Sequence, residues 1–154
     1  MFYNIKDLKE KRILLQKSNN IVVFTNGCFD ILHKGHFQYL KQSKDLGDFL
    51  IVGLNSDKSV KFLKGPGRPV NGEKIRAENL LKLDYVNAVI IFNENTPIKL
   101  IENLLPDIVT KGGDYEIDEI VGSKIIHRNG GEVKILPYLE GFSTTKIISD
   151  KGNA

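Results

Sequence analysis

Short apolar runs alternate with segments in which apolar residues recur every three or four positions, a pattern typical of strands alternating with helices. The predicted strands are Ile21–Phe24, Phe49–Leu54, Ala88–Phe92, Asp107–Thr110 and Val133–Leu136. The predicted helices are Asn4–Ser18, His33–Leu46, Glu73–Leu83 and Val121–Arg128, with further helix starts at Asn55–Asp57, Thr96–Pro97 and Ser143. Continuous apolar strands are typical of parallel sheets buried on both faces. We therefore expect an α/β fold with a Rossmann-like, doubly wound parallel sheet.

The chain is expected to form a single domain over residues 1–154. An N-terminal helix in residues 1–19 would precede a core in residues 20–150, and no repeat, low-complexity tract or linker interrupts the pattern. Residues 64–72 contain three glycines and two prolines. This composition predicts a loop, and a long one for a compact domain.

Composition excludes several classes of protein. Hydrophobic residues make up 41% and charged residues 27% of the chain, as in ordinary globular proteins, which excludes a disordered tail, a collagen-like rod or a disulfide scaffold. The single Cys28 cannot form an internal disulfide, which fits a reducing compartment. The first 20 residues are too charged for a signal peptide, and no apolar run reaches the ~18 residues of a membrane span. We expect a cytoplasmic protein without a membrane partner.

The net charge of +3 hides an uneven distribution. Residues 58–76 contain six basic side chains and one glutamate, so the rest of the chain is net negative. Lys58 and Lys61 are interpreted as a solvated helix face. Lys64 and Arg68 lie in the Gly/Pro-rich loop and Arg76 on the next predicted helix, and these three are candidates for binding phosphate.

Glycines and polar residues follow the predicted strands, where ligands of open α/β sheets bind. They are Thr25, Asn26, Gly27, Cys28, Phe29 and Asp30 after the first strand, Asn55 after the second, Lys111, Gly113 and Asp114 after the fourth, and Ser143, Thr144 and Thr145 after the fifth. Hydroxyl groups, cations and glycines at one sheet edge predict the binding of an anion.

The sharpest local signal is His33-Lys34-Gly35-His36 at the start of a predicted helix. Residues three apart share a helix face, so His33 and His36 are expected to lie together. Gly35 would let a ligand approach the backbone, and a helix N-terminus favours phosphate. Two imidazoles could then donate hydrogen bonds to a phosphate in a charge-rich transition state. The structural alternative is that one histidine packs while the other caps the helix.

The same residues allow two other kinds of chemistry, a zinc site and nucleophilic catalysis by a cysteine. A structural zinc site needs four ligands, and beyond the His33/His36 pair the chain offers only Cys28 and the distant His127, so no metal site is predicted. Cys28 could act as a nucleophile with His33 as its base, but a small apolar filler is the commoner role directly after a strand.

The segment Thr25–His36 resembles the opening motif of the cytidylyltransferase-like nucleotidyltransferases, and Gly141–Ile148 resembles their C-terminal Ser-Thr-Thr motif. Leu63–Gly65 with Arg68–Val70, and Val109–Tyr115, are similar to the D-glycero-β-D-manno-heptose 1-phosphate adenylyltransferases, which make ADP-heptose for bacterial surface polysaccharide. The resemblance covers roughly residues 20–150. It implies transfer of AMP from ATP to the sugar 1-phosphate with release of pyrophosphate.

The resemblance also implies roles for individual residues. His33, His36 and Arg76 would be catalytic. Thr25, Asn26, Gly27, Cys28, Phe29, Gly35, His36, Lys111, Gly113, Asp114, Ser143, Thr144 and Thr145 would bind the nucleotide. Asp30, Asn55, Lys64 and Arg68 would bind the sugar phosphate. Magnesium would accompany ATP with few protein ligands, a separate sugar kinase would supply the sugar phosphate, and a homo-oligomer is expected because relatives commonly form one.

Alternatives remain at this point. Related cytidylyltransferases carry an arginine where Tyr138 stands and an acid where Gly113 stands, which weakens CTP as the donor, while guanylyl transfer stays open. A regulatory module that binds nucleotide without turnover is the non-enzymatic alternative. A nucleic-acid-binding module is disfavoured because the basic loop lacks interleaved aromatic residues to stack bases.

Overall fold

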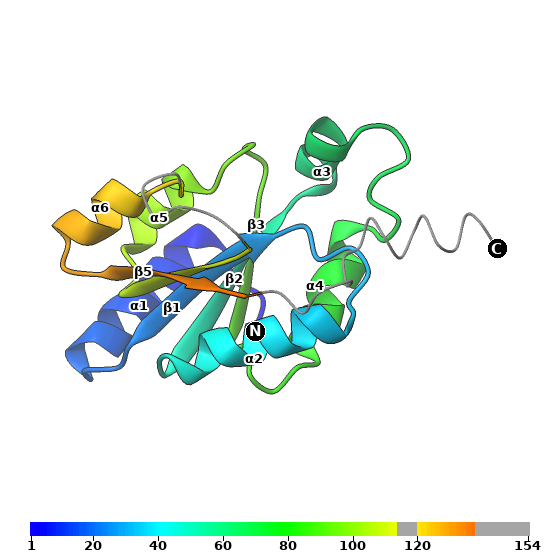
Figure 1. Cartoon of the computed structure of the whole chain (residues 1–154). Helices are drawn as coiled ribbons and strands as arrows, with labels where there is room; N and C mark the ends of the chain where they lie inside the picture. The colour runs from blue at the N-terminus through cyan, green and yellow to red at the C-terminus, as the bar shows by residue number, and fades with distance from the viewer. Residues whose placement is uncertain (114–119, 138–154) are drawn as a thin grey trace.

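The computed structural model describes residues 1–113 and 120–137. Its centre is a five-stranded, wholly parallel sheet. The strands are β1 (Val22–Gly27), β2 (Phe49–Asn55), β3 (Ala88–Phe92), β4 (Ile108–Gly112) and β5 (Glu132–Leu136). Their order across the sheet is β3-β2-β1-β4-β5 (Figure 1), which is the doubly wound arrangement that the sequence predicts.

Helices cover both faces of this sheet (Figure 1). The helices are α1 (Ile5–Lys17), α2 (Lys34–Asp45), α3 (Asp57–Lys64), α4 (Glu73–Leu81), α5 (Ile98–Leu104) and α6 (Ser123–Arg128). One apolar cluster joins α1, α5 and α6 to the sheet, with Phe24 among its buried members. A second cluster joins α2 and α4 to the opposite face, where Val23 lies. Consecutive residues of β1 therefore point into different cores, which explains its unbroken apolar run.

Most predicted elements are confirmed to within a few residues. The largest differences are in β1, which continues three residues beyond Phe24, and in Pro97, which is the N-cap of α5 rather than its first helical residue. The helix predicted from Ser143 lies outside the described residues. Among the residues that are described, no helix is long and apolar enough to cross a membrane.

From β1 the chain adds β2 and β3 on one side of the sheet and then β4 and β5 on the other side. The direction in which strands are added therefore reverses at the β1/β4 boundary. Four buried hydroxyl groups join β1, α2 and β4 there. The Tyr39 hydroxyl lies 2.7 Å from Thr25 Oγ1 and donates to Thr110 Oγ1 at 3.2 Å, and Ser43 Oγ lies 2.9 Å from Thr110 Oγ1. This network fixes α2, the helix that begins at the histidine motif.

Replacing Tyr39 with phenylalanine would remove the central hydroxyl, so that Thr25 Oγ1 and Thr110 Oγ1 each lose one buried hydrogen-bond partner. We expect the free energy of unfolding to fall by about 1–2 kcal/mol. Urea denaturation monitored by circular dichroism measures this. Tyr85→Phe is the matched control, since Tyr85 is only partly buried, and we expect it to change stability by less than about 0.5 kcal/mol. Equal stability of the two variants would contradict a structural role for the network.

Candidate active site

The histidine motif forms the N-terminus of α2. His33 is the N-cap residue, and its Nδ1 accepts a hydrogen bond from the Gly35 amide at 3.1 Å. Because Nδ1 accepts, the neutral imidazole must carry its proton on Nε2. The capping role that the sequence offered as the structural alternative is therefore present. It also orients the ring, so that capping and catalysis are compatible.

The two imidazoles of the motif stack on each other. The ring centroids of His33 and His36 are 3.8 Å apart with an interplanar angle of 26°. Phe29 packs edge-on against His36 with centroids 5.3 Å apart, and its backbone is left-handed, with φ at 45°. A Cβ on Gly27 would come within 2.8 Å of the Phe29 ring. Glycine at this position therefore allows the contact between Phe29 and His36.

The environment of His36 keeps its imidazole uncharged. Burial, with repulsion from His33, lowers the pKa of His36 to about 4, although a backbone hydrogen bond with Ile31 opposes the shift. Burial also lowers the pKa of His33. Nδ1 of His36 is buried and has no hydrogen-bond partner among the described residues. A neutral stacked pair at a helix N-terminus can bind an anionic ligand by hydrogen bonding without a formal positive charge.

Asp30 has a different role from the one expected. Its side chain is buried, and its carboxylate accepts the backbone amides of Val70 and Asn71, both at 2.8 Å. Arg68 Nε is 3.4 Å from the same carboxylate, and Asn71 Nδ2 donates to the Asp30 carbonyl at 2.8 Å. The side chain expected to face the sugar therefore holds the 65–72 loop against the chain that follows β1.

Arg76 also differs from the expectation of phosphate contact. Its side chain is fully buried in α4, and four of its five N–H groups are committed to protein acceptors. They donate to the carbonyl oxygens of Asn71, Cys28 and Asn55 at 2.9, 2.8 and 2.8 Å, and to Asp57 Oδ1 at 2.8 Å. Arg76 therefore positions the elements around the site through these four N–H groups, and its catalytic role stays a prediction.

Three further predicted site residues at the strand ends form hydrogen bonds within the protein. Thr25 is fully buried in the hydroxyl network described above, and the Asn55 amide donates to Ser59 Oγ at 2.9 Å. Gly113 has a φ of 101°, and its amide donates to the Leu136 carbonyl at 3.1 Å. These contacts fix the carboxyl ends of β1, β2 and β4, and the predicted contacts of these three residues with a ligand stay predictions.

The remaining described candidates line the carboxyl end of β1 and its surroundings. Asn26 and Cys28 are partly buried, and burial raises the pKa of the Cys28 thiol, although Lys64, Arg76 and Arg68 oppose the shift. A protonated thiol is a poor nucleophile, which disfavours covalent catalysis by Cys28. Burial lowers the pKa of Lys111 in β4. Lys64 is exposed at the end of α3.

Some candidates cannot be placed. Asp114, Ser143, Thr144 and Thr145 lie outside the described residues, so the expected second wall of the site stays a prediction. Within residues 1–113 and 120–137, no three His, Cys, Asp or Glu side chains are arranged to hold a metal ion.

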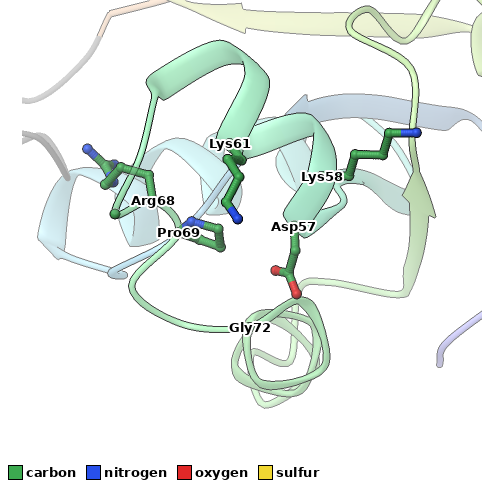
Figure 2. Close-up of a pocket in the computed structure, with 7 residues that line it drawn as sticks. Asp57, Lys58, Lys61, Arg68, Pro69 and Gly72 are labelled. Atoms are coloured by element: carbon green, nitrogen blue, oxygen red, sulfur yellow. The ribbon is translucent and has the colours of Figure 1, made fainter.

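A pocket of about 420 Å³ lies between α3 and the 65–72 loop (Figure 2). Its lining residues are Asp57, Lys58, Lys61, Gly67, Arg68, Pro69 and Gly72. Only Arg68 among them is a predicted site residue. Lys61 is exposed, as its place on a solvated helix face predicts, and its side chain points into the space between α3 and the loop. In the sequence, the excess of positive charge in residues 58–76 indicates that this region could bind an anion.

The fold and the histidine motif together define a nucleotide-binding α/β domain. The family model for cytidylyltransferase-like proteins matches residues 24–150. The chain therefore belongs to the cytidylyltransferase-like family and is a nucleotidyltransferase.

Individual relatives agree with this assignment. The chain is 53% identical over 144 residues to the bifunctional protein HldE of Campylobacter jejuni and 50% identical over 147 residues to that of Campylobacter concisus. These matches cover 94% and 95% of the chain but 30% of each relative, so the chain spans less than a third of their length.

Two solved structures share the fold. The lipopolysaccharide core biosynthesis protein from Thermoplasma volcanium is 34% identical with a TM-score of 0.64, and the match covers 78% of this chain and 97% of that one. A pantoate-beta-alanine ligase from Francisella tularensis has a TM-score of 0.62 at 17% identity, over 98% of this chain and 77% of that one, and shows the fold alone.

The lowered pKa of His36 predicts a pH-dependent stability. The unfolded chain binds a proton at His36 near pH 6.5, whereas the folded protein binds it only near pH 4. The stabilisation is complete above pH 6.5 and is lost as the pH falls toward 4, with a slope of at most about 1.4 kcal/mol per pH unit from this group. Urea denaturation at a series of pH values measures the slope.

His36→Asn is the control for this measurement, because it removes the titrating group. We expect a shallower dependence of its unfolding free energy on pH between 6.5 and 4. If this variant and the wild type lose stability in parallel over that range, the neutral state of His36 in the folded protein is contradicted.

Proposed function

We propose that the protein transfers AMP from ATP to D-glycero-β-D-manno-heptose 1-phosphate, forming ADP-heptose and pyrophosphate. The observation that carries this proposal is the stacked, uncharged pair of His33 and His36 at the N-terminus of α2, beside the β1/β4 boundary. The motifs that resemble heptose 1-phosphate adenylyltransferases support the choice of substrates. The relatedness to HldE and to a lipopolysaccharide core biosynthesis protein also supports it.

In this reaction an oxygen of the sugar phosphate attacks the α-phosphorus of ATP. The bond from that phosphorus to the α,β-bridging oxygen breaks, and pyrophosphate leaves with the bonding electrons. A phosphate monoester is already ionised at neutral pH, so the enzyme needs no general base. Catalysis then depends on positioning the reactants and on stabilising charge on the α-phosphate.

The site residues have matching roles in the proposal. His33 Nε2–H and the His36 imidazole would donate hydrogen bonds to the α-phosphate, and Gly35, whose amide donates to His33 Nδ1, would make room for it because it has no side chain. Asn26, Cys28, Phe29, Lys111 and the chain near Gly113 and Asp114 would surround the nucleoside. Ser143, Thr144 and Thr145 would hold the β- and γ-phosphates. Arg68 and Lys64 would meet the acceptor phosphate.

Magnesium would enter this site bound to the triphosphate. Asp30, three residues before His33 in the sequence, has its carboxylate committed to the amides of the 65–72 loop. A site with few free carboxylates suits Mg²⁺, which commonly keeps several waters and binds through substrate phosphates. Its chemistry would be to neutralise charge on the phosphates. A separate sugar kinase would supply the sugar 1-phosphate.

Cytidylyl or guanylyl transfer to another sugar or polyol phosphate is the second candidate, because the family model is described for cytidylyltransferase-like proteins. A panel of nucleoside triphosphates separates the two. We expect ATP with Mg²⁺ and heptose 1-phosphate to release pyrophosphate at least about tenfold faster than CTP or GTP, measured with a coupled phosphate assay. Folded protein that binds ATP by calorimetry but releases no pyrophosphate with any acceptor would contradict the proposal and indicate a regulatory module.

Replacing His36 with alanine would remove one donor to the α-phosphate in the transition state. We expect kcat to fall by at least about a hundredfold, with only a modest change in stability near neutral pH. His127→Ala is the matched control, since His127 is exposed on α6, and its kcat should equal that of the wild type. Wild-type turnover by the His36 variant would exclude the transition-state role.

A further inference from the structure

The pocket between α3 and the 65–72 loop contains no residue of the histidine motif among its lining residues. One wall is α3, which contributes Asp57 and Lys61, and the other is the loop, which contributes Arg68 and Gly72. Figure 2 shows Lys61 and Asp57 pointing into the space between the walls, while Lys58 points away from it. Its volume of about 420 Å³ lies within the range of pockets for small-molecule ligands.

The two polar side chains that point into the pocket differ in whether another side chain is paired with them. Lys61 forms no ion pair with any other residue in the described part of the chain. Asp57 is fixed, because its Oδ1 accepts from the fully buried Arg76 and its backbone amide donates to Glu73 Oε1 at 3.0 Å. The Asp57 side chain is nevertheless 48% exposed. The pocket therefore offers a fixed hydrogen-bond acceptor beside an unpaired donor.

This lining indicates the chemistry of the ligand. No lining residue is aromatic, so the pocket has no surface on which a nucleotide base would stack. A carboxylate beside an ammonium group suits neutral hydroxyl groups, which both donate and accept hydrogen bonds. The ligand that fits is polyhydroxylated.

The pocket is connected to the proposed reaction centre through two arginines. Arg76 links Asp57 to the Cys28 carbonyl, at the carboxyl end of β1. Arg68 lines the pocket, and its Nε lies 3.4 Å from Asp30, next to the Phe29 that packs on His36. Arg68 Nη2 is buried without a hydrogen-bond partner among the described residues. A sugar phosphate could therefore place its phosphate toward Arg68 and its sugar in the pocket.

We propose that this pocket binds the sugar moiety of the acceptor, with Asp57 accepting and Lys61 donating hydrogen bonds to its hydroxyl groups. The inference rests on the proposed function, because it assigns the acceptor side of the same reaction. Gly72 belongs to this subsite because a Cβ there would lie 3.8 Å from Asp57 Oδ2. The free protein tolerates that contact, but the added side chain would occupy space over the carboxylate.

Two variants test the subsite by steady-state kinetics. Lys61→Gln removes the donor charge, and Gly72→Ser adds a side chain while keeping a residue that caps helices well. We expect Lys61→Gln to raise the KM for heptose 1-phosphate about tenfold, as for loss of one charge-assisted hydrogen bond, and to leave the KM for ATP unchanged. Gly72→Ser should raise the same KM because its side chain occupies space over the Asp57 carboxylate, again without changing the KM for ATP. Lys74→Gln is the matched control, since Lys74 is exposed on α4 outside the pocket, and it should change neither constant.

If both variants keep the wild-type KM for the acceptor, or if they raise the KM for ATP equally, the subsite is excluded while the proposed function stands. A direct binding measurement distinguishes failure of the subsite from failure of the proposed function. Reductive methylation of lysines, read by peptide mass spectrometry, should be slowed at Lys61 by heptose 1-phosphate but not by inorganic phosphate, and unchanged at Lys74. Protection without turnover would support the subsite and exclude the proposed reaction. Turnover without protection would exclude the subsite.

Discussion

The rest of the site depends on the hydrogen bonds and the ion pair that the Arg76 guanidinium forms. A fully buried charge is tolerated only when it is well hydrogen-bonded, and four of the five N–H groups of Arg76 donate to three backbone carbonyls and a carboxylate from three segments of the chain. It thereby fixes the ends of β1 and β2, the 65–72 loop and the start of α3 relative to one another. Arg76 thus joins Cys28, which follows β1, to Asp57, which lines the pocket.

Asp30 complements Arg76 at the same place in the fold. Arg76 donates to carbonyl groups, whereas the Asp30 carboxylate accepts amides of the loop, so the two charges satisfy backbone groups that no regular secondary structure pairs. An irregular loop is thus held in one conformation, and its Arg68 side chain lies between the reaction centre and the pocket. Rigid positioning of this kind is what transfer without a covalent intermediate requires.

The sheet, the helix order and the place of the histidine motif could be predicted from the sequence, because apolar periodicity determines buried strands and helix faces. The roles of Thr25, Asp30, Asn55 and Arg76 could not. Each is a polar residue at a strand end or near the basic loop, and sequence cannot distinguish a side chain that meets a ligand from one that satisfies buried backbone. The sequence predicts Lys61 on a solvated helix face, and the structure confirms that it is exposed. Its proximity to the loop opposite α3 could not be predicted, because nothing local in the sequence indicates that loop.

In the proposed reaction, uncharged imidazoles stabilise the α-phosphate of ATP while a sugar phosphate attacks it. The most direct measurement follows the label from ATP into the products formed with heptose 1-phosphate. We expect label from the α-phosphate to appear in the nucleotide sugar and label from the γ-phosphate to appear only in pyrophosphate. Label from the γ-phosphate in the sugar product, or label from the α-phosphate confined to free nucleotide, would contradict nucleotidyl transfer at this site.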